Sequence, residues 1–299
     1  MMEFRQLKTF LMIAKLGSFS KAANILGYAQ STITMQIQAL EEELGTILFE
    51  RGSRKIGLTR EGENLYWYAE QILKLTEEAI DSTTCGDQPK GTIVIGTPES
   101  LCLNRLHELI KEYRLYCPEV EIKLRFGTCC DLHDMLSKNL IDIAFFLDEP
   151  ISEDKLVTHV LFNEPVLLLA SPKHPLASKA CVTPEDIHGE FLILTESGCN
   201  YRARFESFTS SQQIHPCSTM EVSSVEIIKR FTRDNLGITV LSKTAVQDEL
   251  DQNQLIALPW TGPSFDVSAQ MVYQKEKKLS PALKRFIALT LDRMRKLTK

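Results

Sequence analysis

The sequence of 299 residues lacks the short motifs that mark several common classes of enzyme. It contains no Gly-rich phosphate-binding loop, no Gly-x-Ser-x-Gly nucleophile elbow and no His-Glu-x-x-His zinc motif. Its six histidines are scattered along the chain, and its eight cysteines form no Cys-x-x-Cys pair. We therefore expect neither an enzyme nor a cofactor or metal site, although an α/β enzyme stays open as an alternative.

Long hydrophobic runs are also missing. The longest, near residues 141–147 and 165–170, fall well short of the about 20 apolar residues that cross a bilayer as a helix. No secretory signal peptide is recognisable, so the cysteines are expected to be reduced and the protein cytoplasmic, with no membrane partner. A binding protein of the exported, transport type is the third class considered, and these absences speak against it.

What the sequence does contain is two short helical patterns joined by a tight turn within residues 18–48. Ser20 is expected to cap the first helix, and Gly27 is placed to end it. The second helix is expected to open at Gln30 and Ser31. Its apolar residues recur at spacings of 4, 3 and 4 and should all face the core: Ile33, Ile37, Leu40 and Leu44.

The other face of the second helix carries short or amide side chains, which can hydrogen-bond base edges or phosphates in a major groove. An ordinary helical hairpin with a solvated face is the alternative. With the cap of the first helix included, the candidate DNA contacts in this region are Ser20, Gln30, Ser31, Thr32, Thr34, Met35, Gln36 and Gln38.

A basic segment follows and favours the DNA-binding interpretation. Arg51, Arg54 and Lys55 flank turn residues and short apolar points, which is typical of a hairpin or wing that contacts the DNA backbone or minor groove. Residues 1–60 carry eight Lys and Arg against five Asp and Glu, a net charge of +3, so the rest of the chain carries −8 of the total of −5. This asymmetry supplies phosphate contacts without making the whole protein basic.

These residues, in this order, closely resemble the N-terminal domain of LysR-type transcriptional regulators. The resemblance is carried by Phe10, Ala22, Ala23, Gln30, Ser31, Ile37, Leu40, Glu41, Leu44, Gly45, Leu48, Phe49, Arg51, Leu58, Thr59 and Gly62. It extends over essentially the whole chain. Two positions depart from the family pattern, since Ala29 stands where Ser is frequent and Met35 where Arg is frequent, and both departures bear on which operator is read.

The pattern after the basic segment predicts a long helix from Thr59 to about Ser82. Leu65, Tyr68, Ile72, Leu75 and Ala79 alternate at spacings of 3 and 4, as in a seam between two paired helices. A single amphipathic helix packed on its own domain is the alternative. Turn-forming residues at 83–90 then mark the best domain boundary in the chain.

Residues 91–299 alternate short apolar strands with helical segments, which predicts a parallel or mixed sheet and two similar α/β halves. Strands are expected at 92–96, 121–126, 141–146, 165–170, 191–194 and 237–241, and a further strand is expected to end at 220–222.

The resemblance implies a definite architecture of α/β class. It comprises a winged helix-turn-helix (1–58), a linker and dimerisation helix (59–82), a hinge (83–90) and a periplasmic-binding-protein-like effector domain (91–299). Subdomain I would take 91–163 plus 268–299, and subdomain II 164–267. The resemblance further implies a homodimer or homotetramer on an interrupted inverted repeat of double-stranded DNA, a small-molecule effector and RNA polymerase as a further partner.

Ligands of open α/β sheets bind beyond the carboxyl ends of the strands, where helices begin. The residues that follow four predicted strands are therefore candidate effector contacts because they converge on one edge, although a Ser or Thr after a strand is more often a helix cap. They are Ser100, Thr128, Cys129, Thr195, Cys199, Arg202, Ser223 and Ser224. Hydroxyls and helix N-termini favour a small anion such as a carboxylate, with Arg202 as its charge partner.

Two further features of residues 91–299 bear on chemistry, a pair of aspartates and one cysteine. Asp131 and Asp134 are expected to be the solvated first turn of a helix rather than a catalytic pair. Cys199 follows Gly198 and precedes Arg202, a setting that would lower the pKa of the thiol at a helix start. A redox-sensing regulator that uses Cys199 is therefore the alternative to regulation by a metabolite, against the packing role expected for most cysteines.

Overall fold

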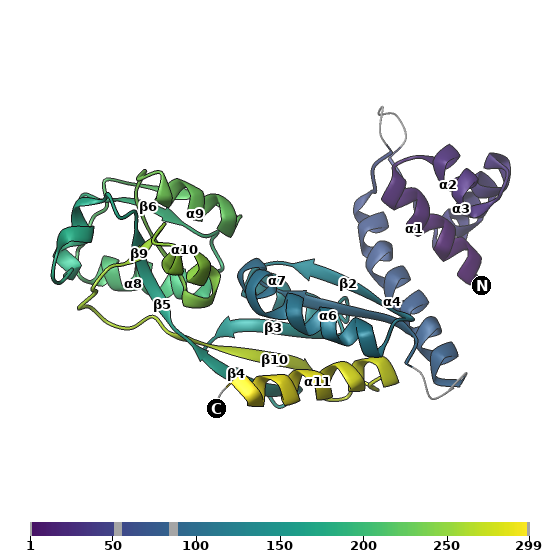
Figure 1. Ribbon diagram of the computed structural model, residues 1–299. Helices are drawn as coiled ribbons and strands as arrows, with labels where there is room; N and C mark the ends of the chain where they lie inside the picture. The colour runs from purple at the N-terminus through teal and green to yellow at the C-terminus, as the bar shows by residue number, and fades with distance from the viewer. Residues whose placement is uncertain (1, 51–55, 84–88, 298–299) are drawn as a thin grey trace. The chain divides into compact units, whose positions relative to one another are not determined.

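The computed structural model describes residues 2–50, 56–83 and 89–297 (Figure 1). The chain divides into two compact units, Met1–Gly86 and Asp87–Lys299. One hydrophobic cluster lies wholly in the first unit, and three others lie wholly in the second. Each unit therefore has a core of its own.

The first unit is helical in its described part. Its helices are α1 (Phe4–Leu16), α2 (Phe19–Leu26), α3 (Gln30–Leu44) and α4 (Arg60–Thr83). The sequence analysis did not predict α1, although its buried Leu7, Phe10, Leu11 and Ile13 follow a helical spacing. Phe10 packs on Phe49 with ring centroids 5.3 Å apart, and this contact joins α1 to the segment that follows α3.

The ends of α2 and α3 test the predicted turn chemistry. Gly27 ends α2 in the left-handed conformation (φ 70°), as predicted. The predicted cap was wrong by two residues, because Ser18 caps α2 by accepting from the backbone N–H of Lys21, whereas Ser20 lies within the helix. Leu44 was also wrongly assigned to the core: it is 41% exposed, since it is the last residue of α3.

The second unit contains two five-stranded mixed sheets, which confirms the α/β fold class. The first sheet has the order β2-β1-β3-β10-β4. Its strands are β1 (Gly91–Thr97), β2 (Val120–Phe126), β3 (Ile143–Asp148), β4 (Leu156–Glu164) and β10 (Val267–Gln274). β1 is parallel to β2 and β3, whereas β10 runs antiparallel to β3 and β4.

Helices cover both faces of this first sheet. They are α5 (Glu99–Leu101), a π-helical turn (Cys102–Leu106), α6 (His107–Tyr116), α7 (Cys129–Ser137) and α11 (Pro281–Leu297). Tyr113 of α6 donates a hydrogen bond to the carbonyl of Ala282 and packs edge-on against Phe286, so α6 and α11 share one core. Leu132 and Leu136 of α7 are buried in a separate cluster. This arrangement leaves the carboxyl ends of β1 and β2 free for the starts of α5 and α7.

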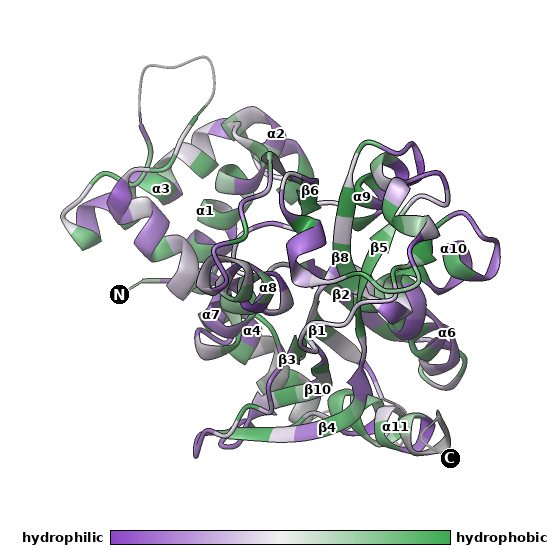
Figure 2. Cartoon of the chain, turned by 90° about the vertical axis from the view of Figure 1, so that its left-hand side faces the viewer, coloured by the Kyte–Doolittle hydropathy of each residue, from purple (hydrophilic) through white to green (hydrophobic). Residues whose placement is uncertain are grey.

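The second sheet has the order β7-β6-β8-β5-β9. Its strands are β5 (Val166–Ala170), β6 (Phe191–Leu194), β7 (Ser218–Glu221), β8 (Ile238–Ser242) and β9 (Ile256–Ala257). Its helices are α8 (Asn200–Ser211), α9 (Val225–Arg233) and α10 (Gln247–Asp251), with short 3-10 turns at Pro175–Ser178, Pro184–Ile187 and Lys243–Val246. In Figure 2 the ribbon of β5 is largely green, as expected for a strand covered on both sides.

The chain passes between the two sheets twice, at Pro165 between β4 and β5 and again between β9 and β10. Six of the strands lie within one or two residues of those predicted. β4, β9 and β10 were not predicted. β4 and β10 carry polar residues within the strand, such as His159 and Gln270, which break the continuous apolar run that marked the other strands.

Candidate functional site

The outer face of α3 is polar and accessible, whereas Ile33, Ile37 and Leu40 on its inner face are fully buried. Met35, at the position where the LysR family has Arg frequently, is 67% exposed. Beside it, the side chains exposed on the same helix include four more of the predicted DNA contacts: Gln30, Ser31, Thr32 and Gln38. The helix therefore presents the short and amide side chains that groove recognition needs.

Two predicted contacts on α3 are engaged within the protein. Thr9 donates a 2.6 Å hydrogen bond to Oε1 of Gln36, which ties α3 to α1. Thr34 donates to the backbone carbonyl of Gln30 at 2.9 Å. Gln36 therefore has a structural contact that sequence analysis missed, because nothing in the local sequence pairs position 36 with position 9.

A cavity of 440 Å³ lies between the start of α2, the face of α3 and the segment after it. Ser20, Gln30, Thr34 and Gln38 line it together with Ser18. The cavity therefore gathers four of the predicted contacts at one surface. The predicted wing residues Arg51, Arg54 and Lys55 lie outside the described residues.

The segments that flank those wing residues pair with each other. Phe49 and Leu58 form an antiparallel bridge, and the backbone N–H of Glu50 donates to the carbonyl of Gly57 at 3.0 Å. The N–H of Thr59 donates to the carbonyl of Leu48, also at 3.0 Å. Residues 48–50 and 57–59 thus form the base of a hairpin that leads directly into α4.

The long helix α4, which follows the hairpin, packs in part on its own unit, and its pairing with a second helix stays a prediction. Ala69 of α4 is buried in the core of the first unit, and Leu65 and Ile72 pack against that core, so the helix does cover its own domain. Tyr68 and Leu75, also in the predicted seam, are 58% and 67% exposed. The seam therefore splits into a side used within the unit and a side that faces away from it.

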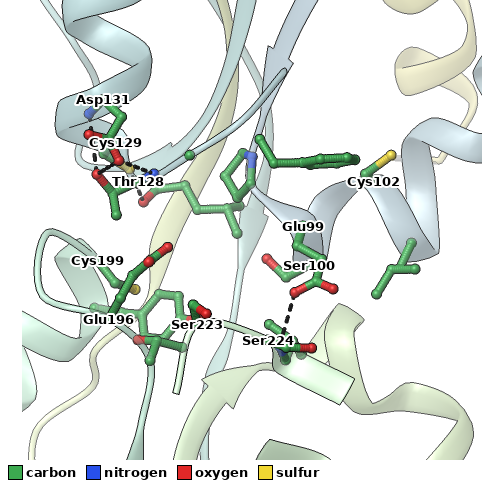
Figure 3. A pocket seen from close by; sticks show the side chains of 18 residues that line it. Glu99, Ser100, Cys102, Thr128, Cys129, Asp131, Glu196, Cys199, Ser223 and Ser224 are labelled. Carbon is green, nitrogen blue, oxygen red and sulfur yellow. Dashed lines mark hydrogen bonds between the residues drawn. The ribbon is translucent and has the colours of Figure 1, made fainter. Parts of the chain in front are cut away.

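A cleft of 560 Å³ opens in the second unit at the carboxyl ends of β1, β2 and β6 (Figure 3). It is lined from both sheets, with the starts of α5 and α7 on one side and the β6–α8 loop and the start of α9 on the other. The structure brings together at this cleft seven of the eight predicted effector contacts: Ser100, Thr128, Cys129, Thr195, Cys199, Ser223 and Ser224.

The start of α7 is held by a reciprocal cap. Thr128 accepts a hydrogen bond from the N–H of Asp131, while Asp131 accepts from the N–H of Thr128 at 3.0 Å and from its hydroxyl at 2.7 Å. Asp131 also lines the cleft. Asp131 lies in the first turn of a helix, as predicted. Its place on the wall of the cleft was not predicted.

Two of the contacts between the two sides of the cleft involve Glu99 and Gly198. The carboxylate of Glu99, at the start of α5, accepts a hydrogen bond from the backbone N–H of Val225 in α9 at 3.0 Å (Figure 3). At Gly198 (φ +99°), a Cβ would lie 3.1 Å from the hydroxyl of Thr128. The loop after β6 therefore needs glycine both for its conformation and for this close approach.

Arg202, predicted as a charge partner for the effector, is not among the residues that line the cleft. Its guanidinium bonds to Glu206 at 3.0 Å, to Glu221 at 2.6 Å and to the carbonyl of Thr195. These contacts hold Arg202 behind the loop that carries Thr195. Its spacing from Cys199 placed it on the first turn of α8, but spacing alone did not show which acidic residues would pair with it.

Burial works against activation of the thiols in the cleft, including that of Cys199, which the redox-sensing alternative requires to be reactive. Burial raises the pKa of Cys199, and burial followed by the charge of Asp148 raises the pKa of Cys129 to about 12. Because the thiolate is the reactive form, both groups are held in their unreactive state at neutral pH. The helix start that was expected to lower the pKa of Cys199 is outweighed by the loss of solvent.

The charged side chains that line the cleft are acidic, and the predicted preference for an anion stays a prediction. Glu99, Asp131 and Glu196 line the cleft, whereas none of its lining residues in the described chain is Lys, Arg or His. Sequence analysis missed Glu196 and Glu99 as site residues. The signal was present, because each stands next to a predicted contact, Thr195 or Ser100, directly after a strand.

Two other kinds of feature are absent from the described part of the chain. No three His, Cys, Asp or Glu side chains there are grouped so as to hold a metal ion. No described helix has both the length and the apolar character needed to cross a membrane.

A helix-turn-helix unit joined to a cleft between two α/β sheets defines a ligand-responsive DNA-binding protein. Comparison with known families supports this class directly. The profile described as "Bacterial regulatory helix-turn-helix protein, lysR family" matches residues 4–63, and that of the "LysR substrate binding domain" matches residues 86–295. The chain belongs to the LysR family of transcriptional regulators, as its sequence motifs indicated.

Individual relatives agree over the full length. The Bacillus subtilis (strain 168) regulator YwqM is 37% identical over 97% of this chain and 98% of its own, and GltR of the same organism is 30% identical over 97% of both. Among solved structures, CbnR in complex with its target DNA has a TM-score of 0.72 at 21% identity, covering 98% of this chain and 100% of its own. A full-length OxyR variant from Pseudomonas aeruginosa has a TM-score of 0.69 at 23% identity, covering 99% and 95%.

Proposed function

We propose that this regulator reads its operator with the exposed face of α3 and the basic segment after it, and that a small molecule in the cleft controls DNA binding or bending. The contacts that support direct readout are Gln30, Ser31 and Gln38, whose side chains are exposed on one helix. As a LysR regulator the protein acts on DNA as an oligomer, and two recognition helices then meet successive major grooves of an interrupted inverted repeat. Because it acts on DNA, its proposed localisation is the cytoplasm.

Effector control is carried by one observation: the cleft at the carboxyl ends of β1, β2 and β6 collects side chains from both sheets. Ser100 and Thr128 come from the first sheet, and Thr195 and Ser224 from the second. A ligand that contacts both sets changes the relation of the two sheets, and this is the differential contact that a regulatory switch requires. The function proposed is that of a regulator rather than an enzyme.

DNA titration of variants tests the readout. Gln38→Ala should weaken binding to the operator by about tenfold or more, because one base-edge contact is worth roughly 1–3 kcal/mol, and should leave non-specific binding unchanged. Gln212→Ala, an exposed glutamine in the second unit, is the matched control and should bind like wild type. Arg54→Ala should weaken binding to all sequences and reduce the salt dependence by about one ion.

The titrations decide whether Gln38 reads bases by comparing specific with non-specific DNA binding. Equal operator affinity for Gln38→Ala and Gln212→Ala would remove Gln38 from the readout. Selection of sites from random DNA by wild type and Met35→Arg adds a second measurement. Identical consensus sequences would show that Met35 does not meet the bases, since a thioether makes apolar contact with thymine whereas arginine reads guanine.

A further inference from the structure

The acidic residues of the cleft differ in what they already bind. Asp131 accepts from Thr128 at the start of α7, and Glu99 accepts from Val225 at the start of α9. The N–H groups at a helix start form a site that attracts an anion. At α7 and α9 two of the chain's own carboxylates occupy that place. An anionic effector would have to compete with them.

Glu196 is the third acidic residue of the cleft, after Asp131 and Glu99. It lines the cleft on the loop after β6, and no hydrogen bond or ion pair holds its side chain among the described residues. Burial, then the charges of Asp131, Glu221 and Glu99, raise the pKa of Glu196. Its negative charge is therefore set among other negative charges and lacks a compensating partner, while the nearby Arg202 is paired with Glu206 and Glu221.

A second, independent feature lies beside Glu196. The side-chain hydroxyl of Thr195 is buried next to the side chains of Cys199 and Tyr201, it makes no hydrogen bond of good geometry among the described residues, and the residue is only 8% exposed. A buried hydroxyl without a partner costs free energy, so such groups in native proteins call for an explanation. Thr195 lines the same cleft, where its oxygen is available to accept a hydrogen bond from a ligand.

The remaining wall is apolar. Leu103, Phe126, Leu147 and Val225 line the cleft with the ring of Tyr201. A cavity of 560 Å³ with an apolar wall and a few polar groups has the size and character of a small-molecule site. The wall suits the carbon skeleton of a ligand, while Glu196 and Thr195 present acceptors on the second sheet's side.

We propose that the effector of this regulator is an organic cation whose ammonium group donates to the carboxylate of Glu196 and the hydroxyl of Thr195. This inference rests on the proposed function, because it names the ligand class of the same cleft. The carboxylates of Asp131 and Glu99 add to the negative field that attracts the cation and discriminate against carboxylate ligands. The apolar wall holds the remainder of the molecule.

Thermal unfolding of the full-length protein with paired probes tests this assignment. The cations are pentylamine and 1,5-diaminopentane, and the anions of matched length are pentanoate and glutarate, all at millimolar concentration. A ligand that binds the folded state raises the melting temperature by mass action. The amines should raise it and the carboxylates should not. Glu196→Gln should weaken amine binding by about tenfold or more, since a hydrogen bond to a charged group is lost.

Glu276→Gln removes an exposed carboxylate far along the chain, in the turn before α11, and should leave amine binding unchanged. Thr195→Val should weaken it to a smaller degree. Stabilisation by the carboxylates, absence of any shift with the amines, or full amine binding by Glu196→Gln would each overturn the inference. Specific operator binding, measured on the same preparations without probe, separates this result from the proposed function, which fails only if that binding is absent.

Discussion

The carboxylate of Glu99 accepts the backbone N–H of Val225 at 3.0 Å and thereby links the first turn after β1 to the first turn of α9. The two residues belong to different sheets, so the bond spans the cleft. A carboxylate at a helix start also stabilises the positive end of the helix. Glu99 therefore contributes one of the bonds that hold the two sides of the cleft together.

Glu99→Ala should loosen this link. The loss is expected to be about 1 kcal/mol in the free energy of unfolding, at the low end for a charged hydrogen bond because Glu99 is partly exposed. The amide of Val225 should exchange its hydrogen faster with solvent. Hydrogen exchange measured by mass spectrometry on the full chain checks this. Glu99→Gln, which keeps an acceptor, should stay close to wild type, and unchanged exchange at α9 in Glu99→Ala would contradict the link.

Sequence patterns located the cleft but not its charge. Ser100, Thr128 and Thr195 could be predicted because each follows an apolar strand, and strand ends meet at one edge of a sheet. The pairing of Arg202 with Glu221 depends on a β7 position that no local spacing encodes. Because this contact was not predicted, Arg202 was treated as unpaired beside hydroxyl groups. An anionic effector was inferred for that reason.

The same distinction holds for the fold. Gly27 and the core of α3 follow from local rules, since turn chemistry and helical spacing act over a few residues. β10 could not be predicted this way, because buried Gln270 bonds to the N–H of Ile151 and to the carbonyl of Glu149. Those partners lie more than a hundred residues away in the sequence. In the local sequence the polar Gln270 interrupts the apolar pattern from which a strand is predicted.

Amine binding should weaken in acid at a higher pH than is normal for glutamate. The pKa of Glu196 is raised by burial and by Asp131, Glu221 and Glu99, so the side chain takes up its proton early as the pH falls. Protonation removes the charge that holds the ammonium. Titration of pentylamine affinity against pH should show this loss in wild type and not in Glu196→Gln.

In the protein without amine, the contribution of Glu196 to the free energy of unfolding should fall, and not rise, as the pH increases. A carboxyl whose pKa is raised by folding contributes stability below its unfolded pKa, and that contribution is lost as the pH rises through the folded pKa. Glu196→Gln should therefore flatten the stability profile over that window. A profile identical to that of wild type would argue against the raised pKa of Glu196.

Alkylation should divide the cysteines by burial. Cys199 and Cys129 should react slowly with iodoacetamide at pH 8, because burial raises the pKa of both thiols, that of Cys129 to about 12. Exposed Cys130, Cys181 and Cys217 should react at the rate of ordinary free thiols. Peptide mapping after timed alkylation gives each rate. Fast modification of Cys199 in the folded protein would revive the redox-sensing alternative.

Gln36→Ala should affect stability as well as DNA binding. The substitution leaves the buried hydroxyl of Thr9 without the acceptor that it now has at 2.6 Å, which should cost about 1–2 kcal/mol in the free energy of unfolding of the first unit. Thr9→Val removes the donor instead and leaves the Gln36 amide on α3. Operator affinity measured on both variants, alongside urea unfolding, separates the two roles. If Thr9→Val binds the operator normally while Gln36→Ala does not, Gln36 contacts DNA; equal losses would assign it to positioning α3.

Asp142 is 3% exposed and pairs with Lys277 across the first sheet of the second unit, with Oδ1 and Nζ 2.6 Å apart. Its other oxygen accepts from the N–H of Val94 at 2.7 Å. Lys277→Met leaves the buried carboxylate without this cation, and we expect a loss of about 3 kcal/mol in the free energy of unfolding, because an uncompensated buried charge is costly.

The exposed neighbour Lys278 provides the matched control, and Lys278→Met should unfold at the same urea concentration as wild type. Adding Asp142→Asn to Lys277→Met removes the charge that lost the Lys277 cation and keeps an oxygen for Val94, so the double variant should recover part of the loss. This recovery distinguishes an electrostatic cost from a simple loss of packing by the lysine stem. A double variant less stable than Lys277→Met would instead show that the negative charge on Asp142 is needed for its bond to Val94.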